Sequence, residues 1–444
     1  MIQAVRNAFL LPDLRRRILF TLMMLVIYRA AAHIPVPGVD KDALQRVLAG
    51  TGGASNLANI LDLLSGGGLT NFSLLAAGVY PYITASLVIQ LLSGVVPALE
   101  RLLREEGSEG RRKLDQYTYL LALPMAALQA IGQIQLLSQG GPIIPNFGTN
   151  GLLTLTVIVS MTAGTTFAIW LSNLITERGI GQGMSIIIFG GIVSRLPSNI
   201  YSLVQDPDRW FVSLAAFIVV LVAVIFVIVI FQEGQRRIPV QYGKRVRGRK
   251  VYGGGATHIP LRVNTAGMIP LIFPQSILTL PAIVAGFVAS SPNPQVSFFF
   301  TQVRDIFSGG RHAQSWMYWV FYFLLVVGFT YFYTSVMMQQ QNLADNLQKQ
   351  GGFIPGIRPG KRTEEYIMGV TTRITLVGAL FLGGVAILPY ILEQIQFGGA
   401  SLLPNATNFS ILSTGLLIVV GVVLDTMRQL EAQLLMRNYE GFIK

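Results

Sequence analysis

The chain has 444 residues, of which 52% are hydrophobic and only 12% are charged, and its formal net charge at pH 7 is +12. Soluble domains of this length do not normally combine these values, so the composition predicts a membrane protein. There is no Cys, which excludes disulfides and thiolate metal sites, and His33, His258 and His312 are too scattered to suggest a metal centre.

Ten apolar runs are long enough to cross a bilayer, which takes about 20 helical residues. The first follows three arginines and has no convincing cleavage site, so we expect an uncleaved helix. No charge occurs from Gln116 to Thr176, a run too long for one helix, and the polar segment 138–151 should divide it. The expected spans are 18–35, 72–94, 116–137, 152–173, 183–204, 210–232, 267–289, 314–336, 374–392 and 409–430.

Charge predicts the orientation of these spans. They place 26 of the 33 Lys and Arg residues on one side and 7 on the other. Basic residues near span ends stay cytoplasmic, so both termini are expected inside. Each half of the chain, 1–206 and 207–444, holds five spans, and an odd number inverts the second half relative to the first. The predicted fold class is an all-α polytopic membrane protein with ten transmembrane helices in two inverted five-helix halves.

A short segment at 56–68 breaks the pattern before the second span. Leu57, Ile60, Leu61 and Leu64 share one helical face, but the piece is too short to span and ends in three glycines. Irregular backbone at membrane depth is tolerated only where protein or a water-filled cavity satisfies it. We therefore expect a re-entrant segment on the outer side.

Two of the predicted cytoplasmic loops are strongly basic. The loop 233–262 contains eight Lys or Arg residues, with KRVRGRK at 244–250 between strand-like segments at 238–242 and 251–252. The loop 340–373 carries GGFIPGIRPGKRTEEY. The tendency of basic residues to stay inside explains scattered charges, but not their concentration in such long loops. An anionic partner is the expected explanation.

The predicted membrane interior is almost free of charge. Arg29, Asp62, Arg195 and Asp425 all fall near span ends or in the re-entrant piece. Ion-coupled transporters place such residues at mid-depth, at a cost of about 2.5 to 3.5 kcal/mol each. A secondary transporter of small solutes, which inverted halves and a broken helix would favour, is therefore the weaker alternative. A purely structural scaffold would leave the glycine-broken segment unexplained, and no catalytic constellation suggests an enzyme.

Four long motifs resemble the SecY family of bacterial protein translocase subunits. They are VYPYITASLVIQLL at 79–92, GIGQGMSIIIFGGIV at 179–193, KVYGGGATHIPLRVNTAGMIPLIFPQS at 250–276 and GGFIPGIRPG at 351–360. The resemblance covers essentially the whole chain in order. It implies a channel in the bacterial inner membrane that passes unfolded secretory chains across and releases transmembrane segments sideways into lipid. No cofactor is implied.

The resemblance also implies roles for particular residues. A ring of apolar side chains at the waist would consist of Val79, Ile83, Ile188, Ile192, Ile272 and Ile418. A plug on the outer side would include Asn56, Leu57, Ile60, Leu61, Leu64, Gly66, Gly67 and Gly68. A polar cluster at the lateral gate would consist of Thr84, Gln129, Gln275 and Ser276. Branched apolar rings seal by dewetting, although Ile in a membrane helix more often serves packing or lipid contact.

The implied partners are the SecE and SecG subunits, the SecA motor ATPase, the ribosome, signal peptides, unfolded preproteins and membrane lipid. The residues expected to bind the cytosolic partners are basic: Lys244, Arg245, Arg247, Arg249, Lys250, Arg358, Lys361 and Arg362. Guanidinium groups suit RNA phosphate through charge and bidentate hydrogen bonds. Among them, Arg358 is the residue that the resemblance singles out.

Overall fold

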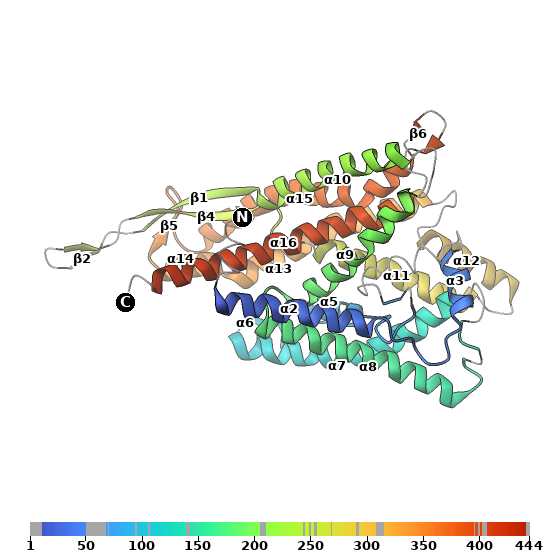
Figure 1. The fold of residues 1–444 in the computed structure, drawn as a ribbon. Helices are drawn as coiled ribbons and strands as arrows, with labels where there is room; N and C mark the ends of the chain where they lie inside the picture. Colours follow the sequence, from blue (N-terminus) through green and yellow to red (C-terminus); the bar gives the residue numbers. More distant parts are fainter. Residues whose placement is uncertain are drawn as a thin grey trace.

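The computed structural model is a bundle of long helices that run roughly along one common direction, with a β-hairpin projecting from one end (Figure 1). We call this the hairpin end. The structure describes residues 11–49, 68–69, 71–93, 96–104, 107–138, 143–145, 147–204, 210–242, 245–247, 250–252, 255–267, 269–289, 293–307, 315–394, 396–397, 400–401 and 406–440.

Ten helices lie on the ten predicted spans. They are α2 (Pro12–Ala31), α5 (Tyr80–Ser93), α7 (Gly107–Ser138), α8 (Gly151–Arg178), α9 (Gly183–Val204), α10 (Trp210–Glu233), α11 (Ile269–Ala289), α13 (Ser315–Gln341), α15 (Lys361–Gln394) and α16 (Ala406–Glu440). Shorter helices that the sequence did not predict are α3 (Lys41–Ala49), α6 (Pro97–Arg104), α12 (Pro294–Phe307) and α14 (Leu343–Lys349).

The outer surface of the bundle is apolar, as lipid contact requires. Along α10, for example, Val219, Val222 and Phe226 are 68%, 58% and 65% exposed. In the described part of the chain, three stretches are by length and composition alone sufficient to cross a membrane: Gly151–Arg178, Trp316–Lys349 and Lys361–Leu388. The fold is that of an α-helical membrane protein.

The predicted second span begins too early. Residues 71–79 form turns, and α5 starts only at Tyr80. Phe72 has a φ of +41°, which a helix does not allow, and the Ser73 hydroxyl donates to the Gly68 carbonyl at 2.9 Å. These turns pack against α8 at Gly164, where a side chain would collide with the Leu74 carbonyl. Tertiary contact therefore overrides an apolar sequence that reads as continuous helix.

Three strands form a sheet at the hairpin end. β1 (Gln235–Tyr242) lies between β4 (Ala256–Arg262) and β5 (Gly352–Phe353), and both neighbours are antiparallel to it. Beyond this sheet, β2 (Arg245–Arg247) pairs with β3 (Lys250–Tyr252). At the opposite end, β6 (Gln396–Phe397) pairs with β7 (Ala400–Ser401). The two strand-like segments of the sequence are strands, whereas β4 and β5 were not predicted.

The sheet has its own small apolar core. Its buried members come from both basic loops and from the helix ends beside them: Ile238, Val240, Leu261, Met338, Leu347, Ile354 and Ile367. The two loops are therefore one structural unit. We call residues 235–262 and 343–362 the basic head.

Candidate functional site

All six ring positions belong to the main apolar core or pack against it. Val79 immediately precedes α5, and its carbonyl accepts a hydrogen bond from the Ile83 amide at 3.2 Å. Ile188 and Ile192 lie on α9, Ile272 on α11 and Ile418 on α16. Five of the six are buried members of one cluster, and Ile83 is partly buried against it. Helices from both halves of the chain thus contribute to one buried apolar core.

Two of the four gate positions are in direct contact. Gln129 on α7 donates through Nε2 to the Thr84 hydroxyl on α5 at 3.2 Å. Thr84 donates in turn to the Pro81 carbonyl at 2.9 Å. A buried amide and hydroxyl therefore tie α5 to α7 inside an apolar bundle.

The other two gate positions lie on α11, which packs against both α5 and α7. Gln275 and Ser276 are buried there. The Ser276 hydroxyl donates to the Ile272 carbonyl of its own helix at 2.9 Å. The Ser276 hydroxyl is thus satisfied within α11.

Sequence reasoning missed a second amide on α7. Gln133 lies one turn beyond Gln129 and is 2% exposed. The Oε1 atoms of both side chains are buried without a hydrogen-bond partner in the described structure. An unsatisfied buried acceptor costs about 1 to 3 kcal/mol. The i, i+4 spacing of two Gln residues in an apolar helix was the available signal.

Most of the plug lies outside the described residues. This applies to Asn56, Leu57, Ile60, Leu61, Leu64, Gly66 and Gly67. Gly68 is described, and its carbonyl accepts from both the amide and the hydroxyl of Ser73, at 3.0 and 2.9 Å. A side chain at Gly68 would collide with the Leu75 carbonyl. The backbone at Gly68 is therefore held by the turn at Ser73.

The basic head carries the residues expected to bind cytosolic partners. Arg245, Arg247 and Lys250 belong to β2 and β3, where Arg247 pairs with Lys250, while Lys244 and Arg249 lie outside the described residues. Arg358, Lys361 and Arg362 are exposed where the chain enters α15. Because β5 pairs with β1, charges from two distant loops project from one body.

The stem of the hairpin adds basic residues that were not predicted to bind. Arg237 lies opposite Pro260, and Arg262 lies opposite Gln235. Residues paired across two antiparallel strands point to one face, so both arginines share the solvent face opposite buried Ile238 and Val240. Without β4, the sequence could not show that the stem has a basic face.

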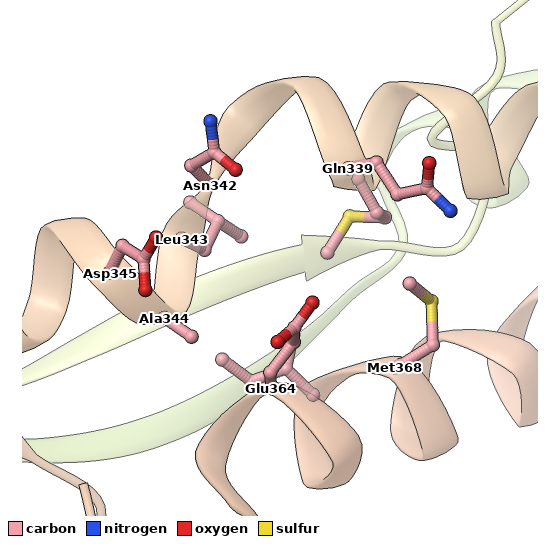
Figure 2. Close-up of a pocket in the computed structure, with 9 residues that line it drawn as sticks. Gln339, Asn342, Leu343, Ala344, Asp345, Glu364 and Met368 are labelled. Carbon is pink, nitrogen blue, oxygen red and sulfur yellow. The ribbon is translucent and has the colours of Figure 1, made fainter. Parts of the chain in front are cut away.

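A small cleft lies behind the head, between α13, α14 and the first turns of α15 (Figure 2). Met338 and Ile367 contribute apolar lining, and Glu364 points into the cleft from α15. Asn342, at the start of α14, has a φ of +44° and makes the sharp turn between α13 and α14. The cleft lies on the concave side of this turn.

Helices with apolar outer faces around a buried apolar core, together with a basic head, define a polytopic α-helical membrane protein. A family model described as SecY matches residues 73–427. The chain belongs to the SecY family.

Relatives match over full length. The protein translocase subunit SecY of Streptomyces galbus is 41% identical over 456 residues, covering 100% of both chains. That of Thermotoga maritima is 40% identical over 451 residues, covering 100% of this chain and 98% of the relative. Membership is thus shown by sequence along the whole chain.

Solved structures agree in fold. One described as the structure of a protein conducting channel has a TM-score of 0.61 at 17% identity and covers 94% of this chain and 92% of its own. Sec61 in a canine ribosome-channel complex has a TM-score of 0.56 at 16% identity, with the same coverage of 94% and 92%. At such low identity the likeness concerns the fold alone.

Proposed function

We propose that this chain is the central channel-forming subunit of a protein translocase in a bacterial inner membrane, with both termini cytoplasmic. Unfolded secretory chains pass through the centre, and apolar segments leave sideways between α5 and α11. The chain is a channel and catalyses no reaction. The observation that carries the proposal is the full-length relationship to SecY subunits, and the membership of the six ring positions, from both halves of the chain, in one apolar core is consistent with it.

In the proposed seal, the side chains that exclude water form no hydrogen bonds with one another. Branched apolar side chains exclude water when packed, and they part without breaking hydrogen bonds when a chain enters. The gate positions fit the same reasoning. Hydrogen bonds between helices in lipid are worth only about 0.6 kcal/mol, so the Gln129 to Thr84 contact holds α5 to α7 without preventing α11 from moving.

The basic head is the proposed docking surface for the partners that supply energy. Cytosolic partners are the SecA motor ATPase, through acidic surface, and the ribosome, through RNA phosphate. SecE and SecG are the proposed membrane subunits, because the exposed apolar faces of the bundle offer room for further helices. The halves 1–206 and 207–444 are proposed to move apart about the waist.

Reconstitution tests the proposal. The purified chain is placed in proteoliposomes with SecE and SecG, and SecA, ATP and a radiolabelled preprotein are added. We expect the preprotein to become protected from external protease, and protection to disappear without ATP. A preprotein lacking its signal peptide is the control. Equal protection of both preproteins, or none with all components present, would contradict the proposed function.

A further inference from the structure

The short connection between α8 and α9 is bonded to two helices from different halves of the chain. We call residues 179–182, which join α8 to α9, the α8–α9 turn. The Ile180 amide donates to the Thr21 hydroxyl of α2 at 3.1 Å, and the Gly181 amide donates to Gln429 Oε1 of α16 at 3.0 Å. Because α2 belongs to the N-terminal half and α16 to the C-terminal half, the turn joins the two halves through its backbone.

Apolar packing accompanies these two hydrogen bonds. Ile180 is 5% exposed and shares a small cluster with Leu14 of α2 and Leu430 of α16. Gly181 has a φ of +84°, and a side chain there would come within 3.1 Å of the Thr426 hydroxyl of α16. The side chains of α16 therefore pack directly on the backbone of the α8–α9 turn.

Each partner in this contact is also fixed within its own half. On the N-terminal side, the Gly183 amide donates to the Thr176 hydroxyl of α8 at 2.9 Å. On the C-terminal side, Arg428 donates to the Gln232 carbonyl of α10 at 3.2 Å and forms an ion pair with Glu233 at 2.7 Å. Two bodies, each held together by hydrogen bonds of its own, therefore meet at the α8–α9 turn.

The two halves of the chain face each other through two sets of helices. In one set α5 and α7 pack against α11, and in the other α9 packs against α10 and α16. The α8–α9 turn adjoins the second set because it leads into α9. The chain itself joins α9 to α10 at the end of the bundle away from the head (Figure 1). An opening motion needs an axis, and this covalent connection and the α8–α9 turn are two points that can define one.

We propose that the α8–α9 turn and residues 426–430 of α16 form a pivot, about which the two halves rotate when the seam between α5 and α11 opens. This inference rests on the proposed function. Hinge motions keep the contacts at the axis while surfaces far from it separate. At the pivot the Gly181 amide keeps its acceptor, whereas at the seam apolar side chains such as Leu87 and Phe273 part. A covalent link across the pivot is therefore compatible with transport.

Hydrogen exchange tests whether Gln429 holds the turn. In Gln429→Ala the Gly181 amide loses its acceptor, so amide exchange in residues 179–183 should become roughly fivefold faster, the effect of one lost hydrogen bond. Gln429→Glu keeps an acceptor oxygen on this side chain and is the matched control, in which exchange should stay unchanged. Equal exchange in Gln429→Ala and in the unmodified protein would overturn the pivot. The measurement uses the purified full-length chain and requires no transport.

Cross-linking tests whether the contact persists during transport. Gln182→Cys with Gln429→Cys places two exposed thiols at the pivot of this Cys-free chain, where a short flexible thiol-reactive bridge can join them. The linked protein should transport preproteins as fast as the same double variant without the link. Leu87→Cys with Phe273→Cys, linked across the seam, is the comparison in which transport should stop.

The two measurements separate failure of the pivot from failure of the proposed function. Transport that stops when Gln182→Cys and Gln429→Cys are linked would show that this contact has to open, and would overturn the pivot. Unchanged exchange in Gln429→Ala would also overturn it, whether or not the chain transports preproteins. Failure of the proposed function would instead appear as absence of transport by the unmodified protein.

Discussion

At the scale of single residues, the centre of the bundle contains apolar side chains that form no hydrogen bonds and a few polar side chains that do. Ile188, Ile192 and Ile272, which we propose to form the seal, are buried in the apolar core, whereas Gln129 and Thr84 share a hydrogen bond. Apolar contacts re-form with any apolar surface, but a hydrogen bond needs a particular partner. We therefore propose that sealing depends mainly on the apolar residues and that the hydrogen-bonded residues contribute to gating.

Polar replacement within the ring should weaken the seal. In Ile83→Asn with Ile192→Asn, amide groups should hydrate the waist and stabilise the open state, since water satisfies them there. We expect higher single-channel conductance and transport of preproteins with defective signal peptides. Deleting residues 56–64 should raise conductance only partly, because the ring still excludes water. If the double Asn variant shows neither change, these isoleucines serve only packing.

Docking should depend on the position of a basic residue more than on total charge. Arg358→Glu should reduce SecA binding and ATP-dependent transport several-fold while leaving the melting temperature unchanged, because Arg358 is exposed and only its carbonyl, which accepts from Thr363 at 2.9 Å, serves the fold. Arg16→Glu, the same change of charge at an exposed position on α2 outside the basic head, is the control. Equal losses in both variants would indicate a diffuse electrostatic effect.

The sequence predicted only some of the residues that lie together in the structure. The ring, gate and docking positions came from resemblance to a family. Their i, i+4 spacing showed that Val79 and Ile83 share a face, but could not show which other helices face them. The unsatisfied amide oxygen of Gln133, and the common face that Arg237 and Arg262 share, depend on tertiary contacts between distant segments. No local pattern encodes such contacts.

At the scale of elements, apolar run length predicted the helices well. Each of the ten runs contains a long helix, because lipid leaves the backbone few other ways to satisfy its polar groups. The start of α5 and the strands β4 and β5 were missed for one shared reason. Residues 71–79 and 256–262 take conformations that neighbours impose, through α8 in one case and through β1 in the other.

The contact between α5 and α11 should open during transport. Leu87 and Phe273 share a small apolar cluster across this seam. In this Cys-free chain, Leu87→Cys with Phe273→Cys, linked by oxidation or by a short thiol-reactive bridge, should abolish transport until the link is reduced. Leu87→Cys with Leu91→Cys, a pair within α5, is the control. Full transport with the seam linked would mean that substrates leave elsewhere.

At the scale of the whole molecule, charge and shape divide the protein into two ends. The basic head and the β6 to β7 hairpin lie at opposite ends of the bundle, and α12 lies at the end away from the head (Figure 1). This arrangement agrees with the positive-inside orientation predicted from sequence. It identifies the head with the cytoplasmic side in our proposal.

Single-Cys labelling tests that orientation. Arg237→Cys on the head and Phe299→Cys on α12 are both at exposed positions. A membrane-impermeant maleimide should label Phe299→Cys in intact spheroplasts and Arg237→Cys only in inverted vesicles. Detergent-solubilised protein, in which both should react, is the control. The reverse pattern would place the head outside and remove the basis for cytosolic docking.

The sheet of the head also has a mechanical consequence. β4 leads directly into α11, and its base is closed by the Val263 amide donating to the Gly234 carbonyl at 2.9 Å. Gly378 of α15 has no room for a side chain there, because a Cβ would come within 2.6 Å of the Val263 carbonyl. The hairpin is thus attached to the rest of the molecule at its base, through the contacts of residues 234, 263 and 378. We infer that a force applied to the hairpin by a cytosolic partner would be transmitted through this base toward α11, which begins at Ile269.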